Sequence, residues 1–215
     1  MMRPALRRLF LTAHLTLSVS WIGAAGSFLV LNVIALTTRD DETVRGAYLS
    51  MNFIGLYVIV PVSLAALATG LAQALGTHWG LLRHYWLLAK LLLTVFAVYA
   101  LLMHQFAAVT EAAKLVSVSS IPVVLNARLH SLGTEILGDV IGGLLILVVV
   151  TALAIYKPWG LTPYGRDRQP GHTLRSDNDA RNSMGFRILL ATIAVLVVIF
   201  KVTLHLTGHN MHHGH

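Results

Sequence analysis

The apolar run from His84 to His104 carries polar side chains that can do chemistry. It reads HYWLLAKLLLTVFAVYALLMH and contains an amine at Lys90, a hydroxyl at Thr94 and an imidazole at His104. At 100° per residue, these three groups share one face of a helix. An imidazole can carry protons or bind a metal, and an amine can pair with an acid. The stripe therefore predicts more than a membrane anchor.

A second set of polar residues lies at the same predicted depth as His104 in later apolar runs. Asp139 and Lys201 each lie about five residues from the end of a predicted span. Glu135 shares a helix face with Asp139, and His205 shares one with Lys201, because four residues make about one turn. We predict that these five residues form a polar membrane cluster. A structural ion pair between Asp139 and Lys201 is one interpretation, and a proton, ion or ligand site is the other.

A third set lies near the opposite membrane boundary. At about 1.5 Å per residue, His14 and Lys90 lie roughly 6 Å and 9 Å inside it, and His84 lies at it. Trp21 shares a face with His14, and Trp86 shares one with Lys90. Neutral imidazole is a good iron ligand, so the group predicts a b-type haem or porphyrin site between two aromatic walls. The alternative is that these residues simply sit at the interface, with Lys90 reaching the headgroups.

The C-terminal tail TGHNMHHGH joins imidazole and thioether groups. His209, His212, His213 and His215 form a candidate site for copper or another divalent metal. Short terminal His-rich tracts also bind metal without a physiological role, and that interpretation stays open.

Composition places all these groups in a membrane protein. The 215 residues are 56% hydrophobic and 12% charged, against about 25% charged in soluble domains. The absence of cysteine excludes disulfides, thiolate catalysis and iron–sulfur ligation. The net charge of +7 comes mostly from short loops between apolar runs, where topology accounts for it, so we expect the lipid bilayer and no nucleic acid as partner.

The apolar runs predict an all-α, polytopic bundle of five transmembrane helices. The spans lie near residues 10–36, 51–75, 84–109, 134–156 and 186–206. We expect a four-helix core over 1–156, a mobile cytoplasmic loop over 157–185, the fifth helix over 186–206 and the tail over 207–215. A polar loop is expected at 37–50. Residues 110–133 are expected to extend the third helix and then lie along the membrane surface.

Basic residues set the expected orientation. With five spans and the N-terminus inside, the inner side receives ten Lys and Arg residues and the outer side four. This predicts a multi-pass protein of the inner (plasma) membrane with a cytoplasmic N-terminus and an extracytoplasmic C-terminus.

Pro61 and several small residues indicate how the helices pack. Pro61 is expected to bend the second span and to free a carbonyl group. The pair Gly142–Gly143 is predicted to be a packing point. Gly23, Ser27, Ala66 and Gly70 offer close-packing faces, with a second copy or a membrane-complex partner as candidate occupants.

Three motifs in order along the chain carry a resemblance to known proteins. They are HLTLSVSWIGAAGSF from His14, YWLLAKLLLTVFAVYALLMH from Tyr85, and YKPWGLTPYGR at the end of the fourth span. Over most of residues 5–166 the chain resembles a group of bacterial integral membrane proteins of unknown function. It also resembles the CopD-like copper-resistance membrane proteins and the HemJ-type protoporphyrinogen oxidases. The HemJ resemblance implies bound haem and roles for a first-helix histidine and a third-helix lysine, which match His14 and Lys90.

These observations favour a membrane protein of uncharacterised function that binds b-type haem or porphyrin near the inner surface. The first alternative is copper or proton transport, or metal handling, through the polar membrane cluster. The second is a HemJ-like enzyme that oxidises a porphyrin. Overall the pattern favours a protein that is not an enzyme, and both alternatives stay open.

Overall fold

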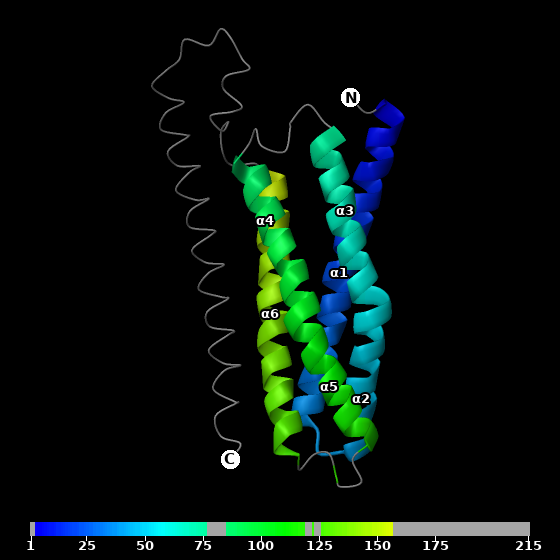
Figure 1. Ribbon diagram of the computed structural model, residues 1–215, viewed down its shortest axis with the longest axis vertical. Coiled ribbons are helices and arrows are strands. Elements are labelled where there is room, and N and C mark those ends of the chain that lie inside the picture. The colour runs from blue at the N-terminus through cyan, green and yellow to red at the C-terminus, as the bar shows by residue number, and fades with distance from the viewer. Residues whose placement is uncertain (1–2, 77–84, 119–121, 123–125, 157–215) are drawn as a thin grey trace, which may run out of the picture. The chain divides into compact units, whose positions relative to one another are not determined.

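In the described part of the chain, all regular structure is helical. The computed structural model describes residues 3–76, 85–118, 122 and 126–156. Its elements are α1 (Pro4–Thr37), α2 (Asp41–Ile54), η1 (Gly55–Ile59), α3 (Val60–Gly76), α4 (Tyr85–Ala100), η2 (Leu101–Gln105), α5 (Phe106–Val118) and α6 (Ala127–Tyr156) (Figure 1). The predicted loop over 157–185, fifth span over 186–206 and tail over 207–215 lie outside the described residues.

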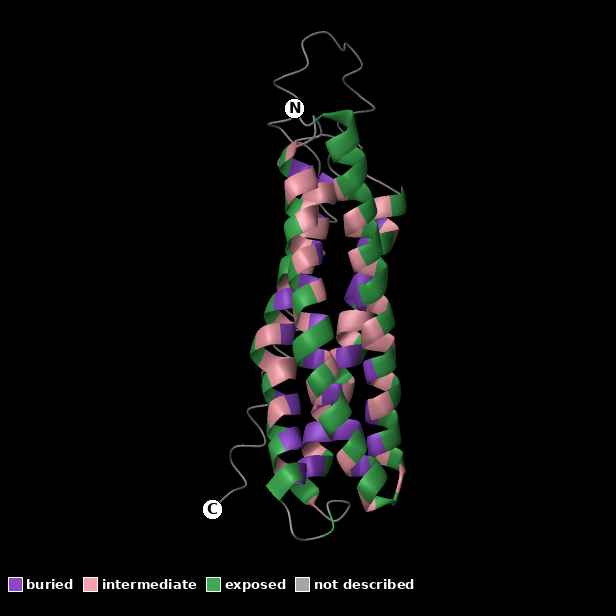
Figure 2. Ribbon diagram, turned by 90° about the vertical axis from the view of Figure 1, so that its right-hand side faces the viewer, coloured by how far each residue is buried: buried purple, intermediate pink, exposed green. Residues whose placement is uncertain are grey.

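Four helical stretches in the described residues are long and apolar enough to cross a membrane. They are Pro4–Thr37, Asp41–Gly76, Tyr85–Val118 and Ala127–Ile155. Many large apolar side chains on them are exposed, among them Leu15, Tyr57 and Leu145, and exposed and buried residues alternate along every helix (Figure 2). A surface of this kind suits lipid, so the chain is a multi-pass membrane protein, and the regular structure of its described residues is all helical.

The polar loop predicted over 37–50 is wrong, because α2 already begins at Asp41. Asp40 caps the helix by accepting a hydrogen bond from the Thr43 backbone N–H at 2.9 Å. Hydrogen bonds from the Thr43 hydroxyl and N–H hold the pKa of Asp40 below its usual value. The first turn also carries Asp41 and Glu42, which favour a helix N-terminus. The loop between the first two spans is therefore only residues 38–40.

The predicted end of the membrane-surface segment at residue 133 is also wrong. The third span continues to Val118, as expected, but α6 begins at Ala127 rather than Thr134. The Asn126 side chain caps this start by accepting from the Arg128 and Leu129 backbone N–H groups at 3.0 and 3.1 Å. An asparagine in this position is a strong helix start signal.

Two spans each contain a π-helical turn. In η1 the Val60 N–H bonds to the Gly55 carbonyl, and in η2 the Phe106 N–H bonds to the Leu101 carbonyl. Pro61 lies two residues after the end of η1 and has no N–H to give to the carbonyl four residues earlier, which explains why the regular pattern changes here. Such turns insert one residue and frequently mark functional sites.

The chain divides into two compact units, and each is described by itself. The first comprises Met1–Thr12, Ala68–Phe96 and Val148–His215, and the second comprises Ala13–Leu67 and Ala97–Leu147. In the first unit, the Gln73 side chain ties α3 to α1 by donating to the Phe10 carbonyl at 2.7 Å. In the second unit, α2 packs on α5, and Arg45 donates to the Val116 carbonyl at the end of α5.

The second unit is held together by a tight contact at Gly133. The buried Asn32 of α1 donates through Nδ2 to the Gly133 carbonyl of α6 at 3.0 Å. Its Oδ1 has no hydrogen-bond partner among the described residues. A Cβ atom at Gly133 would overlap the Tyr48 hydroxyl and would lie 2.6 Å from Leu36 Cδ2. Only glycine therefore lets α1, α2 and α6 meet here.

The close packing predicted at Gly142–Gly143 is wrong within the described residues, whereas the docking of a partner on the face that contains Gly23 stays a prediction. No heavy atom there lies within 4 Å of the Cβ position at any of the three. Ala66 does lie in a close approach, since it is 2% exposed and its carbonyl accepts from His14 of α1. Small residues thus pack α1 against α3 at Ala66, but leave open space beside Gly142 and Gly143.

We predict that Gly133→Ala destabilises the protein by about 1–3 kcal/mol, because the added methyl group overlaps Tyr48 and Leu36 and forces both side chains away from α6. The matched control is Gly138→Ala on the same helix, where no neighbour lies within 4 Å. Unfolding in mixed micelles titrated with sodium dodecyl sulfate measures both. Equal effects of the two substitutions would contradict the steric assignment.

Candidate functional site

An imidazole lies between two carboxylates in the second unit. His104 of η2 places Nδ1 2.7 Å from Asp139 Oδ2 and Nε2 3.6 Å from Glu135 Oε1. The imidazole side chain is 22% exposed and both carboxylates are 18% exposed. The first distance is a short hydrogen bond, and the second is an ion-pair distance beyond hydrogen-bonding range. The structure thus brings together three of the five residues in the predicted polar membrane cluster.

Helix geometry positions this trio, which we call the His104 cluster. Glu135 and Asp139 are four residues apart, so they lie one above the other on one face of α6. His104 lies inside the π-helical turn η2, in the segment Ala97–Leu147 that belongs to the second unit. Counted from the helix ends at about 1.5 Å per residue, His104 is roughly 21 Å from Val118 and Asp139 roughly 18 Å from Ala127. The cluster therefore lies well inside both spans.

The arrangement favours proton chemistry over metal binding. A neutral imidazole has one N–H and can donate to one carboxylate, whereas a protonated ring can donate toward both. The two carboxylates face different ring nitrogens, so the donor atoms diverge instead of converging on one point. Accordingly, the part of the chain that the structure describes contains no group of three His, Asp or Glu residues placed to hold a metal ion.

A more exposed ion pair lies toward the helix ends. Arg128 of α6 and Glu111 of α5 form a two-pronged contact, with Arg128 Nη2 2.9 Å from Glu111 Oε1 and Arg128 Nε donating to the same oxygen at 3.0 Å. Their side chains are 48% and 46% exposed. Arg128 and Glu135 are seven residues apart, two turns along the same face of α6. Ionisable groups therefore continue from the helix ends to the His104 cluster along α5 and α6.

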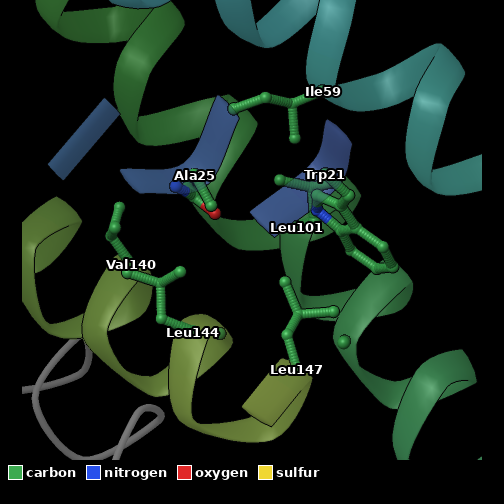
Figure 3. Close-up of a pocket in the computed structure, with 10 residues that line it drawn as sticks. Trp21, Ala25, Ile59, Leu101, Val140, Leu144 and Leu147 are labelled. Atoms are coloured by element: carbon green, nitrogen blue, oxygen red, sulfur yellow. The ribbon is translucent and has the colours of Figure 1, made fainter. Parts of the chain in front are cut away.

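A small cavity lies in the second unit beyond the cluster. Its volume is about 30 Å³, and its walls come from α1, η1, α4, η2 and α6 (Figure 3). The residues that matter for its chemistry are Trp21, Leu101, Gln105, Gly143 and Leu147. Gly143 is four residues after Asp139, so it lies on the same face of α6. The cavity is thus the next feature along the stripe that carries Glu135 and Asp139.

The predicted inner group is divided between the two units, so its meeting at one site stays a prediction. His14 and Trp21 belong to the second unit, Trp86 and Lys90 belong to the first, and His84 lies outside the described residues. Trp21 is buried, and the cavity that it lines measures only about 30 Å³, so it does not fit a porphyrin. A haem bound by His14 would therefore have to lie outside this cavity.

His14 itself has a defined hydrogen bond. Its Nδ1 lies 3.0 Å from the Ala66 carbonyl oxygen. A carbonyl oxygen can only accept, so Nδ1 carries the hydrogen and the neutral ring has its lone pair on Nε2. This is the arrangement that orients metal-binding histidines in proteins.

The other sequence-predicted residues lie outside the described residues. They are Lys201 and His205 of the predicted fifth span and the tail residues His209, His212, His213 and His215. Conversely, the sequence pattern did not predict Gln105 or the Glu111–Arg128 pair, and it indicated Gly143 only as a packing point. The signals for them were present: Gly143 is one turn from Asp139, and Glu111 is two turns from His104.

Comparisons with known proteins leave the site to be interpreted from its own geometry. No family model, no curated protein and no solved structure matches this chain.

We predict that a double-mutant cycle on His104→Ala and Asp139→Ala gives a coupling energy of about 1–2 kcal/mol, because both groups are largely withdrawn from water. The same cycle on Glu111→Ala and Arg128→Ala should give less than about 1 kcal/mol, since water screens that pair. The free energy of unfolding in mixed micelles supplies both values. A reversed order would contradict the geometry of the cluster.

Proposed function

We propose that this protein is a proton-conducting or proton-coupled membrane protein and that the His104 cluster binds and releases the proton. The observation that carries the proposal is the imidazole placed between two carboxylates inside two candidate membrane spans. Ionisable groups inside a membrane span cost at least about 2.5–3.5 kcal/mol each on insertion scales, so they are retained where they have a use.

Three groups that exchange protons in sequence suit conduction better than static pairing. With two carboxylates and one imidazole, the cluster can hold one or two protons without gaining a large net charge. Movement of a proton between Asp139 and Glu135 needs a change in which imidazole nitrogen carries the hydrogen and a closer approach of Nε2 to Glu135 Oε1, which lie 3.6 Å apart. A purely structural ion pair would need only one of the two acids.

The ion pair of Glu111 and Arg128 gives the cluster an entrance. Exposure falls from nearly half at this pair to about a fifth at the cluster. The distribution of Lys and Arg supports an extracytoplasmic position for these helix ends and a cytoplasmic N-terminus in the inner membrane. In this orientation, protons enter from outside. The predicted fifth span would add Lys201 as a further cation and complete a five-helix protein.

We predict that proteoliposomes containing the wild-type protein conduct protons and that Asp139→Asn lowers the flux at least about tenfold, because an amide cannot bind and release a proton. An entrapped pH-sensitive dye, with valinomycin and potassium to set the voltage, measures the flux. The control is Glu42→Gln, the same chemical change at an exposed helix start. Equal flux in Asp139→Asn and wild type would remove the cluster from the mechanism.

A b-type haem held by His14 is the second candidate function. The observation in its favour is the hydrogen bond from His14 Nδ1 to the Ala66 carbonyl, which fixes the ring tautomer that metal-binding histidines use. The resemblance to HemJ-type oxidases adds Lys90 as a second residue for the same ligand. When bound, haem would supply electron-transfer chemistry. Oxidation of a porphyrin by this site, and metal collection by the C-terminal histidines, stay predictions of the sequence.

We predict that protein purified after expression with a haem precursor shows a Soret band, and that His14→Ala abolishes it by removing the ligand. His130→Ala is the matched control, since His130 is exposed at the start of α6. Visible absorption of the detergent-purified proteins measures the band. A colourless wild-type protein, or a Soret band that remains in His14→Ala, would exclude a haem held by His14.

A further inference from the structure

We propose that the cavity next to Gly143 holds a water molecule that extends the proton path beyond Asp139. This inference rests on the proposed proton role of the His104 cluster, and it assigns the next carrier. Glu135, Asp139 and Gly143 follow one another at four-residue intervals on one face of α6. The stripe that holds two acids thus continues into a position without a side chain, and the cavity opens there.

The size of the cavity fits this occupant. Its volume of about 30 Å³ exceeds the roughly 10–15 Å³ that one water molecule requires. It is far too small for an organic ligand of drug size, for which pockets measure about 300–1,000 Å³. Water, or the hydronium ion derived from it, is therefore the chemical class that the space admits.

The walls offer polar partners as well as apolar ones. Gln105 contributes an amide that can donate and accept, and Trp21 contributes an indole N–H that can donate. Leu101 and Leu147 are among the apolar residues that line the cavity (Figure 3). A buried water needs two to four polar partners, and the two side chains meet the lower limit.

The cavity and the His104 cluster share their supporting elements. Gln105 directly follows His104 in η2, and Gly143 follows Asp139 by one turn of α6, about 5.4 Å along the axis. In the transfer, the O–H bond of protonated Asp139 breaks and a new O–H bond forms on the water oxygen, leaving a carboxylate. The water then gives one of its other protons to a further water molecule, so that charge and atoms balance.

Gly143 has a specific role in this scheme, because any larger side chain would fill the cavity. No heavy atom lies within 4 Å of the Cβ position at Gly143 or at Gly142. Both glycines therefore accept a side chain sterically, but only Gly143 lines the cavity. Gly142 is thus a matched control on the same helix.

Water access can be tested separately from proton flux, because the chain has no cysteine. Gly143→Cys and Gly142→Cys each introduce a single thiol. Silver ions, which reach thiols only through water, are applied to proteoliposomes, and remaining thiols are labelled with a maleimide after solubilisation. We expect silver to protect Gly143→Cys at least about tenfold faster than Gly142→Cys. Equal rates, fast or slow, would overturn the water site.

Proton flux then tests the role of the water. We expect Gly143→Val to lower the flux at least about tenfold and Gly142→Val to change it less than about twofold. Gly143→Ala, a milder filling, should give an intermediate loss if the valine variant does not fold. Flux that depends on Asp139 but not on Gly143 would overturn this inference alone. A wild-type protein without flux would overturn the proposed function, while the silver rates would still report on the cavity.

Discussion

The structure depends on one constraint: a polar group inside a membrane span must find its partner within the protein. The described helices expose large apolar side chains, and no water is present in a bilayer core to satisfy a buried donor or charge. The polar groups on these helices accordingly meet one another. His104 meets two acids of α6, Asn32 donates to the Gly133 carbonyl, and His14 contacts the Ala66 carbonyl. These contacts fix which faces of the helices turn inward in the second unit.

The π-helical turns bring backbone irregularity to the same region as the polar groups. Ile59 of η1 and Leu101 and Gln105 of η2 line one cavity, and His104 lies within η2. An inserted residue changes the face that the following residues present, so a regular helix through 101–105 would present His104 and the residues of α5 differently. The proline after η1 gives a chemical reason for the first turn, whereas nothing in the sequence of η2 marks the second.

The sequence predicted the helical class and the spans because lipid demands long apolar runs, and it matched His104 with Asp139 in depth because the rise per residue is fixed. It misplaced the helix starts at Asp41 and Ala127, since average hydropathy overlooks amphipathic turns. There, the buried residues of α2 recur with helical spacing, at Val44, Ala47, Tyr48 and Met51. Gln105 and the role of Gly143 could not be predicted, because they depend on the phase of η2 and on open space between helices.

The two histidines differ in what their hydrogen-bond partners allow. The Ala66 carbonyl can only accept, so it holds the His14 ring in one tautomer, which suits a fixed ligand. The carboxylates of Asp139 and Glu135 can accept a hydrogen bond or take the proton itself, so they leave His104 free to change its protonation, which suits transfer. The two proposed chemistries of the same side chain thus differ in the oxygen atoms that face it. In these proposals, the choice between ligand and proton carrier is set by the partners on α3 and α6, and not by the histidines.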